Sequence, residues 1–356
     1  MTGQQHTESL LVINAGSSSV KYRVFDWDSL SPLDGDKIER IGESGSLCQT
    51  HRQAFEQLLE DTKKFNIKAA AHRVVHGGDF YDTPVLVTDE VMDDLRSLSV
   101  FAPLHQPHNL DAISVLRSLA PDMPQYADFD TAFHAGHDPV MDAYALPKDL
   151  RQRGLRKFGF HGLSYQSICS KLRGERPDLY SNKTVIAHLG NGASLCAVKN
   201  GRSIDTTMGL TALEGLPMGT RSGSVDPGLV LYLGMAMGKS FEELAKILYH
   251  KSGLLGLSNL SNDMKTLEEN AEHNSDAKFA IDVFVHKTSQ HICQMMATLG
   301  GMDALVFTGG IGENSALVRQ AVTQQLSFLP HFEVLVIPTN EELSIAENVR
   351  KLILSI

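Results

Sequence analysis

Two stretches of this chain, about half its length apart, share one pattern: a strand, a turn of small residues and a second strand. In Leu10–Phe25 an apolar run reaches Asn14, a turn rich in glycine and serine follows, and alternating apolar residues resume. Thr184–Asp205 has the same order, with His188 in the place of Asn14. Because an internal repeat decides the architecture of a chain, this pair predicts a duplicated α/β domain with a cleft between the copies.

The turns of the two hairpins are suited to bind an anion. Gly16 lets the backbone pass close to a ligand, and the hydroxyls of Ser17 and Ser19, together with free N–H groups, suit phosphate. The corresponding glycine of the second turn is Gly190. Taken alone, the first stretch fits an ordinary surface hairpin equally well. The repeat favours the phosphate site.

The composition describes a globular chain that must meet anions locally. Hydrophobic residues make up 42% and charged residues 21% of the 356 residues, which favours two domains with substantial cores. The formal net charge of −10 argues against general nucleic-acid binding. Any anionic substrate must therefore be bound by locally placed arginine, lysine and backbone N–H groups.

We expect a cytoplasmic protein without a membrane anchor. The first ten residues lack a basic start followed by an apolar core, and no apolar stretch approaches the ~20 residues of a membrane span. The four cysteines are scattered without metal-ligand spacing, which is typical of reduced packing residues; they are Cys48, Cys169, Cys196 and Cys293.

Two arginines and one aspartate are the first candidates for chemistry. Arg73 interrupts the apolar strand in Lys68–Gly78, and it needs either a ligand or an internal carboxylate as its partner. Arg221 is the one cation in the loop Thr206–Pro227, whose length is typical of a functional loop. Asp130 follows an apolar strand, where α/β sheets place ligand sites, although a helix N-cap is equally consistent.

Three further segments have a predicted local structure. Asp26–Asn66 is expected to be polar and turn-rich, with a helix around Phe55–Lys64. Ala102–Asn109 is expected to be a turn that lines a cleft and leads into a helix at Leu110–Leu119. Asp303–Arg319 is expected to form a strand, a glycine turn and a helix, with Glu313 and Asn314 opening the helix.

Two helix starts also carry candidate residues. Phe160 and His161 precede a helix, a position that suits an acyl or phosphoryl oxygen; a capping histidine on a packed turn is the alternative. Glu341 and Glu342 lie in the first turn of the last helix, where complementing the helix dipole is the alternative to a role with magnesium.

Taken together, the motifs resemble those of the acetate kinase family, within the acetate and sugar kinase/Hsp70/actin superfamily. The matching blocks follow the family's order and cover nearly the whole chain: INAGSSSVKY, AHRVVHGG, APLHQPHN, FDTAFH, GFHGLS, AHLGNGASL, MGTRSG, VFTGGIGENS and IPTNEEL. The resemblance implies two duplicated actin-like (ribonuclease H-like) α/β domains, residues 1–130 with 342–356 and residues 131–341, and an active site in the interdomain cleft. It also implies a homodimer.

The resemblance further implies reversible transfer of the γ-phosphoryl group of ATP to acetate, giving acetyl phosphate and ADP, with Mg²⁺ (for which Mn²⁺ can substitute). Such a transfer needs in-line positioning and neutralisation of the charge on the equatorial oxygens. Because the attacking carboxylate is already ionised at pH 7, no strong general base is required. We therefore expect Asp130 to position groups and serve the metal, and not to abstract a proton.

The family's roles map onto this chain residue by residue. The implied catalytic residues, of which the last two stabilise the transition state, are Arg73, Asp130, His161 and Arg221. Arg73 also holds the acid, whose methyl group meets Val75, Leu104 and Phe160. The residues near the metal are Asn14 and Glu341. The implied ATP-binding residues are Ser17, Ser19, Lys21, His188, Leu189, Gly190, Asn191, Gly192, Gly309, Gly310, Ile311, Gly312, Glu313 and Asn314.

Four positions depart from the family's usual residues. Tyr165 replaces a second histidine, Ser224 an aspartate and Gln106 an asparagine, and Ala212 replaces a common proline. A smaller wall at Ala212 would leave room for another methylene group, worth ~1–3 kcal/mol of discrimination. A propionate kinase of the same family is therefore one alternative. The other is a non-enzymatic ATP-dependent switch on the same fold, like an Hsp70 ATPase domain or actin, which has no need of two arginines around an acyl site.

Overall fold

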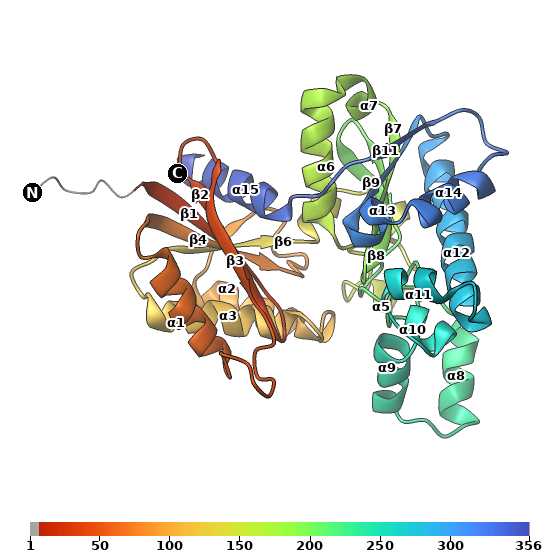
Figure 1. Cartoon of the computed structure of the whole chain (residues 1–356), viewed down its shortest axis with the longest axis horizontal. Helices are drawn as coiled ribbons and strands as arrows, with labels where there is room; N and C mark the ends of the chain where they lie inside the picture. Colours follow the sequence, from red (N-terminus) through yellow and green to blue (C-terminus); the bar gives the residue numbers. More distant parts are fainter. Residues whose placement is uncertain (1–6, 356) are drawn as a thin grey trace, which may run out of the picture. The chain divides into compact units, whose positions relative to one another are not determined.

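The computed structural model describes residues 7–355, which form two compact units (Figure 1). One unit consists of the chain up to Ala135 together with the segment from Asn340 onward, and the other consists of Gly136–Thr339. Each unit is built on one mixed β-sheet with helices packed against it. The chain therefore leaves the first unit once and returns to it for its last helix.

The sheet of the first unit has the strand order β3-β2-β1-β4-β6-β5. Strands β1 to β3 are antiparallel neighbours, whereas β4 and β6 run parallel to β1. The strands are β1 (Glu8–Ala15), β2 (Val20–Asp26), β3 (Pro32–Ile38), β4 (Asn66–Val74), β5 (Val85–Leu86) and β6 (Gln125–Phe129). The α-helices are α1 (His51–Thr62), α2 (Asp89–Ser97), α3 (Gln106–Leu119) and α15 (Glu341–Ser355).

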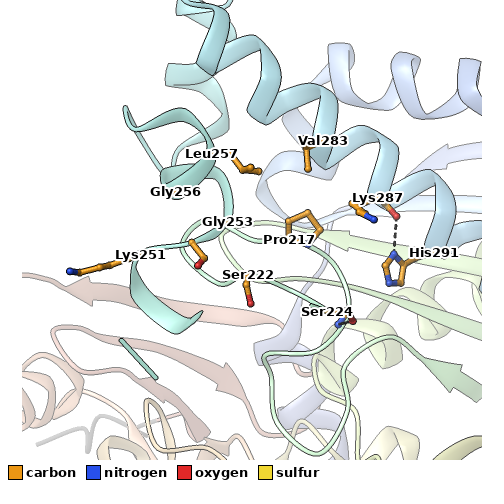
Figure 2. Close-up of a pocket in the computed structure, with 12 residues that line it drawn as sticks. Pro217, Ser222, Ser224, Lys251, Gly253, Gly256, Leu257, Val283, Lys287 and His291 are labelled. Atoms are coloured by element: carbon orange, nitrogen blue, oxygen red, sulfur yellow. Dashed lines mark hydrogen bonds between the residues drawn. The ribbon is translucent and has the colours of Figure 1, made fainter. Parts of the chain in front are cut away.

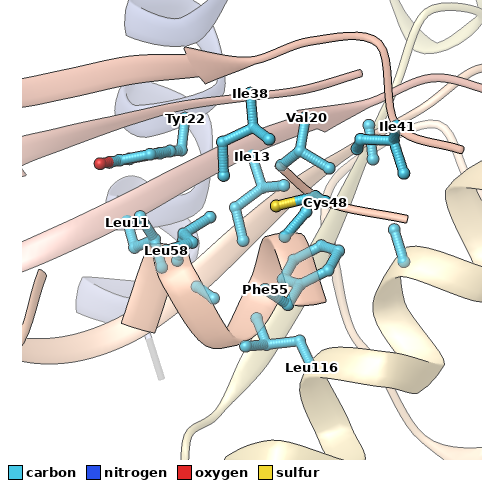
Figure 3. Close-up of a cluster of buried hydrophobic side chains, with 14 of the residues drawn as sticks. Leu11, Ile13, Val20, Tyr22, Ile38, Ile41, Cys48, Phe55, Leu58 and Leu116 are labelled. Carbon is cyan, nitrogen blue, oxygen red and sulfur yellow. The ribbon is translucent and has the colours of Figure 1, made fainter. Parts of the chain in front are cut away.

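Helices cover both faces of this sheet, because its central strands are apolar on both sides (Figure 1). Leu11 and Ile13 of β1 join Phe55 and Leu58 of α1 and Leu116 of α3 in one buried cluster (Figure 3). Helix α15 packs against β1, β4 and β6. Since these three strands are parallel, their carboxyl ends lie together at one edge of the sheet, close to the start of α15.

The sheet of the second unit has the strand order β11-β10-β7-β8-β9. Its strands are β7 (Lys183–Leu189), β8 (Ala193–Lys199), β9 (Arg202–Thr206), β10 (Ala304–Thr308) and β11 (Glu333–Val336). The helices that precede β7 in the sequence are α4 (Pro139–Asp142), α5 (Lys148–Arg151), α6 (Gly162–Glu175) and α7 (Pro177–Ser181), and those between β10 and β11 are α13 (Gly309–Asn314) and α14 (Ala316–Gln325). Between β9 and β10 lie α8 (Pro227–Met235), α9 (Phe241–His250), α10 (Gly253–Ser258), α11 (Met264–Asn270) and α12 (Ser275–Leu299).

The two sheets repeat one topology. Strands β7, β8 and β9 form an antiparallel meander as β1, β2 and β3 do, and β10 and β11 extend the sheet in parallel with β7 as β4 and β6 do with β1. Asn14 pairs with Lys21 across the first hairpin, and His188 pairs with Ser194 across the second. The predicted duplicated actin-like α/β fold is confirmed.

Two predicted turns are wrong in part. The segment Asp26–Asn66 contains β3, whose sequence PLDGDKI is polar because an edge strand is paired on one side only. Ala102–Asn109 is a turn only as far as His105, since α3 begins at Gln106 with a proline in its first turn, where the missing N–H has no helical partner.

A third correction concerns the glycine turn after β10. Residues 309–314 form the helix α13, so Glu313 and Asn314 end this helix and do not open one. The helical conformation is interrupted at Ser315, which caps α14 by accepting a hydrogen bond from Val318 N. Within residues 7–355, no helix combines the length and the apolarity needed to span a membrane.

Candidate active site

Three charged side chains of the first unit meet where β4, β6 and α15 come together. Arg73, on β4, donates from Nε and Nη2 to the carboxylate of Asp130, with Nη2 at 2.8 Å from Oδ2. Its Nη1 lies 3.2 Å from Oε2 of Glu341, the first residue of α15. The internal carboxylate that was the alternative partner for Arg73 is therefore present. Three of the predicted site residues are in direct contact.

This cluster contains more negative than positive charge. Burial raises the pKa of Asp130 to about 6, with Arg73 opposing the shift and Glu341 adding to it. Burial alone would lower the pKa of Arg73, but Asp130 and Glu341 outweigh this effect and raise it. Two carboxylates share one guanidinium, so one negative charge is unbalanced when both are ionised. The cluster is suited to attract a further cation.

The oxygen atoms at this edge of the sheet fit a magnesium ion. Mg²⁺ is commonly held by one or two carboxylates together with substrate phosphates and water. The side chains of Asp130 and Glu341 are 2% and 14% exposed, and Asn14 stands near the carboxyl end of neighbouring β1. Residues 7–355 contain no cluster of three or more His, Cys, Asp or Glu side chains that could hold a metal ion. An ion here would need further ligands from substrate or water.

Lys21 lies beside this cluster in an ion pair of its own. Its Nζ is 2.5 Å from Oε1 of Glu342. Burial would raise the pKa of Glu342, but Lys21 outweighs this effect and lowers it. With 42% of its side chain exposed, Lys21 remains accessible to a ligand. In the preceding turn Ser17 is exposed and Ser19 is partly buried.

The loop after β4 is held by two side chains of α3. Gln106 is fully buried, accepting a hydrogen bond from His76 N at 3.1 Å and donating one to His76 O at 3.0 Å. Asn109 accepts from Val75 N and donates to Ala15 O. Gln106, one of the departures from the family, therefore clamps the peptide next to Val75.

In the second unit, two histidine rings stack at the start of α6. His161 has a left-handed backbone conformation (φ 59°), and its ring centroid lies 4.2 Å from that of His188 on β7. His161 Nδ1 is hydrogen-bonded to Ser194 Oγ at 2.8 Å, and His188 Nδ1 to Ser164 Oγ at 2.8 Å. Because Nδ1 of each ring is engaged, both orientations are fixed, and Nε2 of His161 lies against Gly192.

Tyr165, another departure from the family, supports the same arrangement. Its side chain is fully buried, and its hydroxyl is hydrogen-bonded to Ser194, the residue that also holds His161. Burial raises the pKa of Tyr165 well above its ordinary value, so this hydroxyl stays protonated. Tyr165 therefore helps to position His161 through Ser194.

Arg221 reaches the same point as His161 from the loop that precedes α8. Its Nη1 donates to Ala212 O at 2.7 Å. A Cβ placed on Gly192 would lie 2.9 Å from Arg221 Nη2 and 3.2 Å from His161 Nε2, so both groups occupy the space that a side chain would take. Burial lowers the pKa of Arg221. None of the ion pairs formed within residues 7–355 includes Arg221.

The start of α13 lies against the second hairpin. A Cβ on Gly190 would lie 3.7 Å from Gly310 N. Glu313 is turned inward, where its Oε1 accepts from Gly309 N at 3.0 Å and from Thr339 N at 3.2 Å. Glu313 therefore caps the helix that contains it and anchors the segment before α15.

The other predicted ATP-binding residues of the second unit surround these segments. The buried ones are Leu189, Ile311 and Gly312, and the exposed ones are Asn191, Gly310 and Asn314. Asn191 Oδ1 accepts from Asn262 Nδ2 at 3.0 Å. Asn262 was missed by the sequence reasoning, because the run SNLSND around it has the composition of an ordinary turn.

A hydrogen-bonded row of three side chains centred on His137 was also missed from the sequence, and its role is to hold the fold together. His137 Nδ1 lies 2.9 Å from Asp142 Oδ1, and His137 Nε2 lies 2.8 Å from Ser203 Oγ, which is the order of a serine-hydrolase triad. However, the His137 side chain is 1% exposed and Ser203 is 9% exposed, so a substrate has no access to the hydroxyl. These hydrogen bonds join α4 to β9.

The predicted site residues are divided between the two units. Those of the first unit are Asn14, Ser17, Ser19, Lys21, Arg73, Val75, Leu104, Asp130 and Glu341, and all others belong to the second. Of the three residues predicted to meet the methyl group, Val75 and Phe160 are buried and Leu104 is partly buried.

Known proteins resemble this chain over nearly its whole length. A sequence profile of the acetokinase family matches residues 33–331. An acetate kinase from Nitrobacter hamburgensis is 41% identical over 392 aligned residues, which cover 98% of this chain and 96% of that protein.

Solved structures agree with the sequence comparison. A propionate kinase from Francisella tularensis superposes with a TM-score of 0.88 at 34% identity, covering 96% of this chain and 98% of that one. The acetate kinase of Porphyromonas gingivalis superposes with a TM-score of 0.85 at 32% identity, covering 97% of this chain and 100% of that one.

Proposed function

The chain belongs to the acetokinase family, and we propose that it acts as an acetate kinase, which transfers the γ-phosphoryl group of ATP reversibly to acetate. One observation carries the proposal. The guanidinium of Arg221 and Nε2 of His161 converge on the backbone of Gly192, and the ion pairs of the described residues leave Arg221 without a carboxylate partner. Such a pair of donors suits the charge that develops on a phosphoryl group.

In this proposal Arg221 and His161 bind the equatorial oxygens of the transferring group. The N–H groups of residues 190–192 and of the start of α13 are proposed to bind ATP. The short distance between Gly310 N and Gly190 supports this assignment. Exposed Ser17, with Ser19 and Lys21, supplies further donors to the phosphates. Removing one donor of this kind typically costs ~10²–10³ in rate.

Arg73 is proposed to bind the carboxylate of the acid. Asp130 holds the guanidinium side-on, so its task is to orient Arg73 and to contribute charge. Mg²⁺, when bound, would neutralise phosphate charge, and Asn14, Asp130 and Glu341 are the residues proposed to hold it. The acid attacks as its carboxylate, so no residue has to take a proton from it.

Acetate is proposed as the preferred acid and propionate as the second candidate. Val75, Leu104 and Phe160 are proposed to meet the methyl group, and the small side chain of Ala212 favours the second candidate. The kcat/KM values for acetate, propionate and butyrate measure the preference. Because one methylene group is worth ~1–3 kcal/mol, a preference for propionate of about tenfold or more would overturn the assignment to acetate.

A homodimer is proposed from an exposed apolar surface on α8 and α9. None of the nine residues of α8 is buried, and Leu231, Met235 and Phe241 are 63%, 85% and 87% exposed. Contiguous apolar surface of this kind marks an interface, and a two-fold dimer is the commonest assembly. Sedimentation velocity should show a dimer that Met235→Glu dissociates. A monomeric wild type would overturn the proposal.

The reaction itself is tested with ATP, Mg²⁺ and a short acid, by trapping the acyl phosphate as a hydroxamate. We expect acetyl hydroxamate in proportion to the ADP formed. No hydroxamate with acetate, propionate or butyrate would overturn the kinase and favour the ATP-dependent switch. The cytoplasm is proposed as the compartment, in keeping with four cysteines that form no disulfide.

A further inference from the structure

An open cavity of about 380 Å³ lies beside the loop that contains Arg221 (Figure 2). The loop contributes Pro217, Ser222 and Ser224 to its wall, α10 contributes Leu257, and α12 contributes Val283, Lys287 and His291. The volume is typical of small-molecule sites. None of the residues assigned to phosphoryl transfer lines it, so it is a separate space.

The cavity combines an apolar wall with a basic one. Pro217, Leu257 and Val283 form the apolar part, whereas Lys287 and His291 lie one helical turn apart on α12. The lining contains no aspartate or glutamate, and within residues 7–355 Lys287 forms no ion pair. Ser224, where a relative would usually carry an aspartate, leaves the rim without a carboxylate.

His291 has one ring nitrogen available to a ligand. Its Nδ1 donates to Lys287 O at 2.8 Å, so Nε2 is the free acceptor or, when protonated, a second donor. Burial lowers the pKa of His291, the nearby Lys287 charge lowers it further, and Glu214 opposes this. Tyr144 donates to Glu214 at 2.6 Å, and the amine of Lys251, also on the rim, extends away from the cavity. Lys287, whose Nζ also donates to Gln290 Oε1 at 3.3 Å, is therefore the positive charge of the lining that lies next to His291, and a single cation matches a monoanion.

The walls of the cavity are hydrogen-bonded to the residues on either side of Arg221. Ser252 N donates to Thr220 O at 3.0 Å, and Ser222 N donates to Leu248 O at 2.9 Å. A Cβ on Gly253 would lie 2.0 Å from Met218 O and 2.7 Å from Arg221 O, so the cavity wall at Gly253 packs directly against the backbone of the Arg221 loop. A ligand that shifts or stiffens this wall must also act on the backbone of Arg221.

We propose that this cavity is a second ligand site, which binds a small monocarboxylate with an apolar body and is coupled to Arg221 through residues 215–224. The carboxylate binds between Lys287 and His291, and the body packs against Pro217, Leu257 and Val283. The binding does not depend on the proposed kinase reaction, so the two can fail separately.

Calorimetric titration of the full chain with benzoate tests the binding. Acetate is present throughout at one fixed concentration that occupies the proposed acid site, so that any competition by acetate for the cavity is the same in every titration. Benzyl alcohol has the same ring without the charge, and inorganic phosphate has charge without the ring. We expect benzoate to bind roughly tenfold or more tightly than either, because a hydrogen bond to a charged group and the apolar contact both contribute. Equal affinity for either control, or no binding of benzoate, would overturn the proposal.

Two variants locate the site. Lys287→Gln removes the cation and should weaken benzoate roughly tenfold or more while kcat/KM without benzoate is unchanged. Ser224→Asp adds a carboxylate at the rim and should also weaken benzoate roughly tenfold or more; it serves as a binding test only, because Ser224 Oγ accepts from Gly215 N within the loop that contains Arg221. In the wild type, benzoate should raise the pKa of His291 measured by NMR, because a bound carboxylate favours the imidazolium. It should also change kcat about fivefold or more, the low end of typical coupling between two sites. Undiminished affinity in both variants would remove the site from this cavity, and an unchanged kcat would remove the coupling.

Discussion

Replacing Gly192 by alanine should separate catalysis from folding. The new Cβ would lie 2.9 Å from Arg221 Nη2 and 3.2 Å from His161 Nε2. Ordinary contact begins at 3.4 Å, so the guanidinium must move by about 0.5 Å and the imidazole by less. Both atoms lie at the ends of side chains, so they can move without shifting the backbone.

The size of the effect follows from this displacement. A misplacement of about 1 Å at a reacting group costs on the order of 10²-fold in rate, so we expect kcat to fall by roughly 10–10²-fold in Gly192→Ala. The free energy of unfolding should change by less than about 1 kcal/mol, because the contacts are relieved by side-chain motion. The hydroxamate assay gives kcat, and urea unfolding gives stability.

Two controls make the result specific. Gly174→Ala in α6 places its Cβ where no atom lies within 4 Å, so kcat should be unchanged and stability slightly higher. In an Arg221→Ala background the Gly192 substitution should cost far less than in the wild type, because its main target is gone. Full activity in Gly192→Ala, or an equal loss in both backgrounds, would refute the convergence of Arg221 and His161 at this glycine.

Three further predictions concern polar side chains that are hydrogen-bonded inside the fold. Without metal, burial raises the pKa of Asp130 to about 6, so Asp130 binds its proton more tightly in the folded state. Its contribution to stability therefore declines as the pH rises from 3.8 to about 6, and denaturant unfolding without Mg²⁺ across this range should show a flatter profile in Asp130→Asn. Because Mg²⁺ beside Asp130 would lower this pKa, kcat/KM for acetate should fall at or below about pH 6 as Asp130 becomes protonated, and Asp130→Asn should lack this step. Glu313→Ala should lower the free energy of unfolding by about 1–3 kcal/mol, since Gly309 N loses its acceptor. Glu313→Gln keeps an acceptor oxygen and should lose much less stability. Equal losses in the two variants would contradict the capping role. Gln106→Ala should raise the KM for acetate and destabilise the chain by about 1–3 kcal/mol per buried His76 group left unpaired, and an unchanged KM would remove Gln106 from the support of the acid site.

Local signals explain how much of the fold could be predicted. The two hairpins have turns of glycine and small polar residues between apolar runs, and β6 and α9 end at comparable turn residues, so their bounds follow from neighbours in the chain. Strand β3 could not be predicted in this way. Its sequence PLDGDKI contains proline, glycine and two aspartates, and it is a strand only because β2 offers it an edge.

In the candidate site, too, some features follow from the local sequence and others depend on tertiary contacts. Arg73 and Asp130 were identifiable because a charged side chain in or after an apolar strand needs a partner. The anchoring of Thr339 by Glu313 across 26 residues, and of Asn191 by Asn262 across 71, depends on tertiary structure and has no local signature. The helical geometry of residues 309–314 likewise depends on packing against β7, since glycines favour a turn when considered alone.

Arg221 is proposed to act on the transferring phosphoryl group and not on nucleotide binding. The most direct test measures Arg221→Ala beside the wild type, with ATP affinity from calorimetry and the rate of acetyl phosphate formation from ³¹P NMR under saturating ATP, Mg²⁺ and acetate. We expect a Kd for ATP within about threefold of the wild type and a rate lower by ~10²–10³. An unchanged rate, or a loss of rate fully explained by weaker ATP binding, would contradict this role.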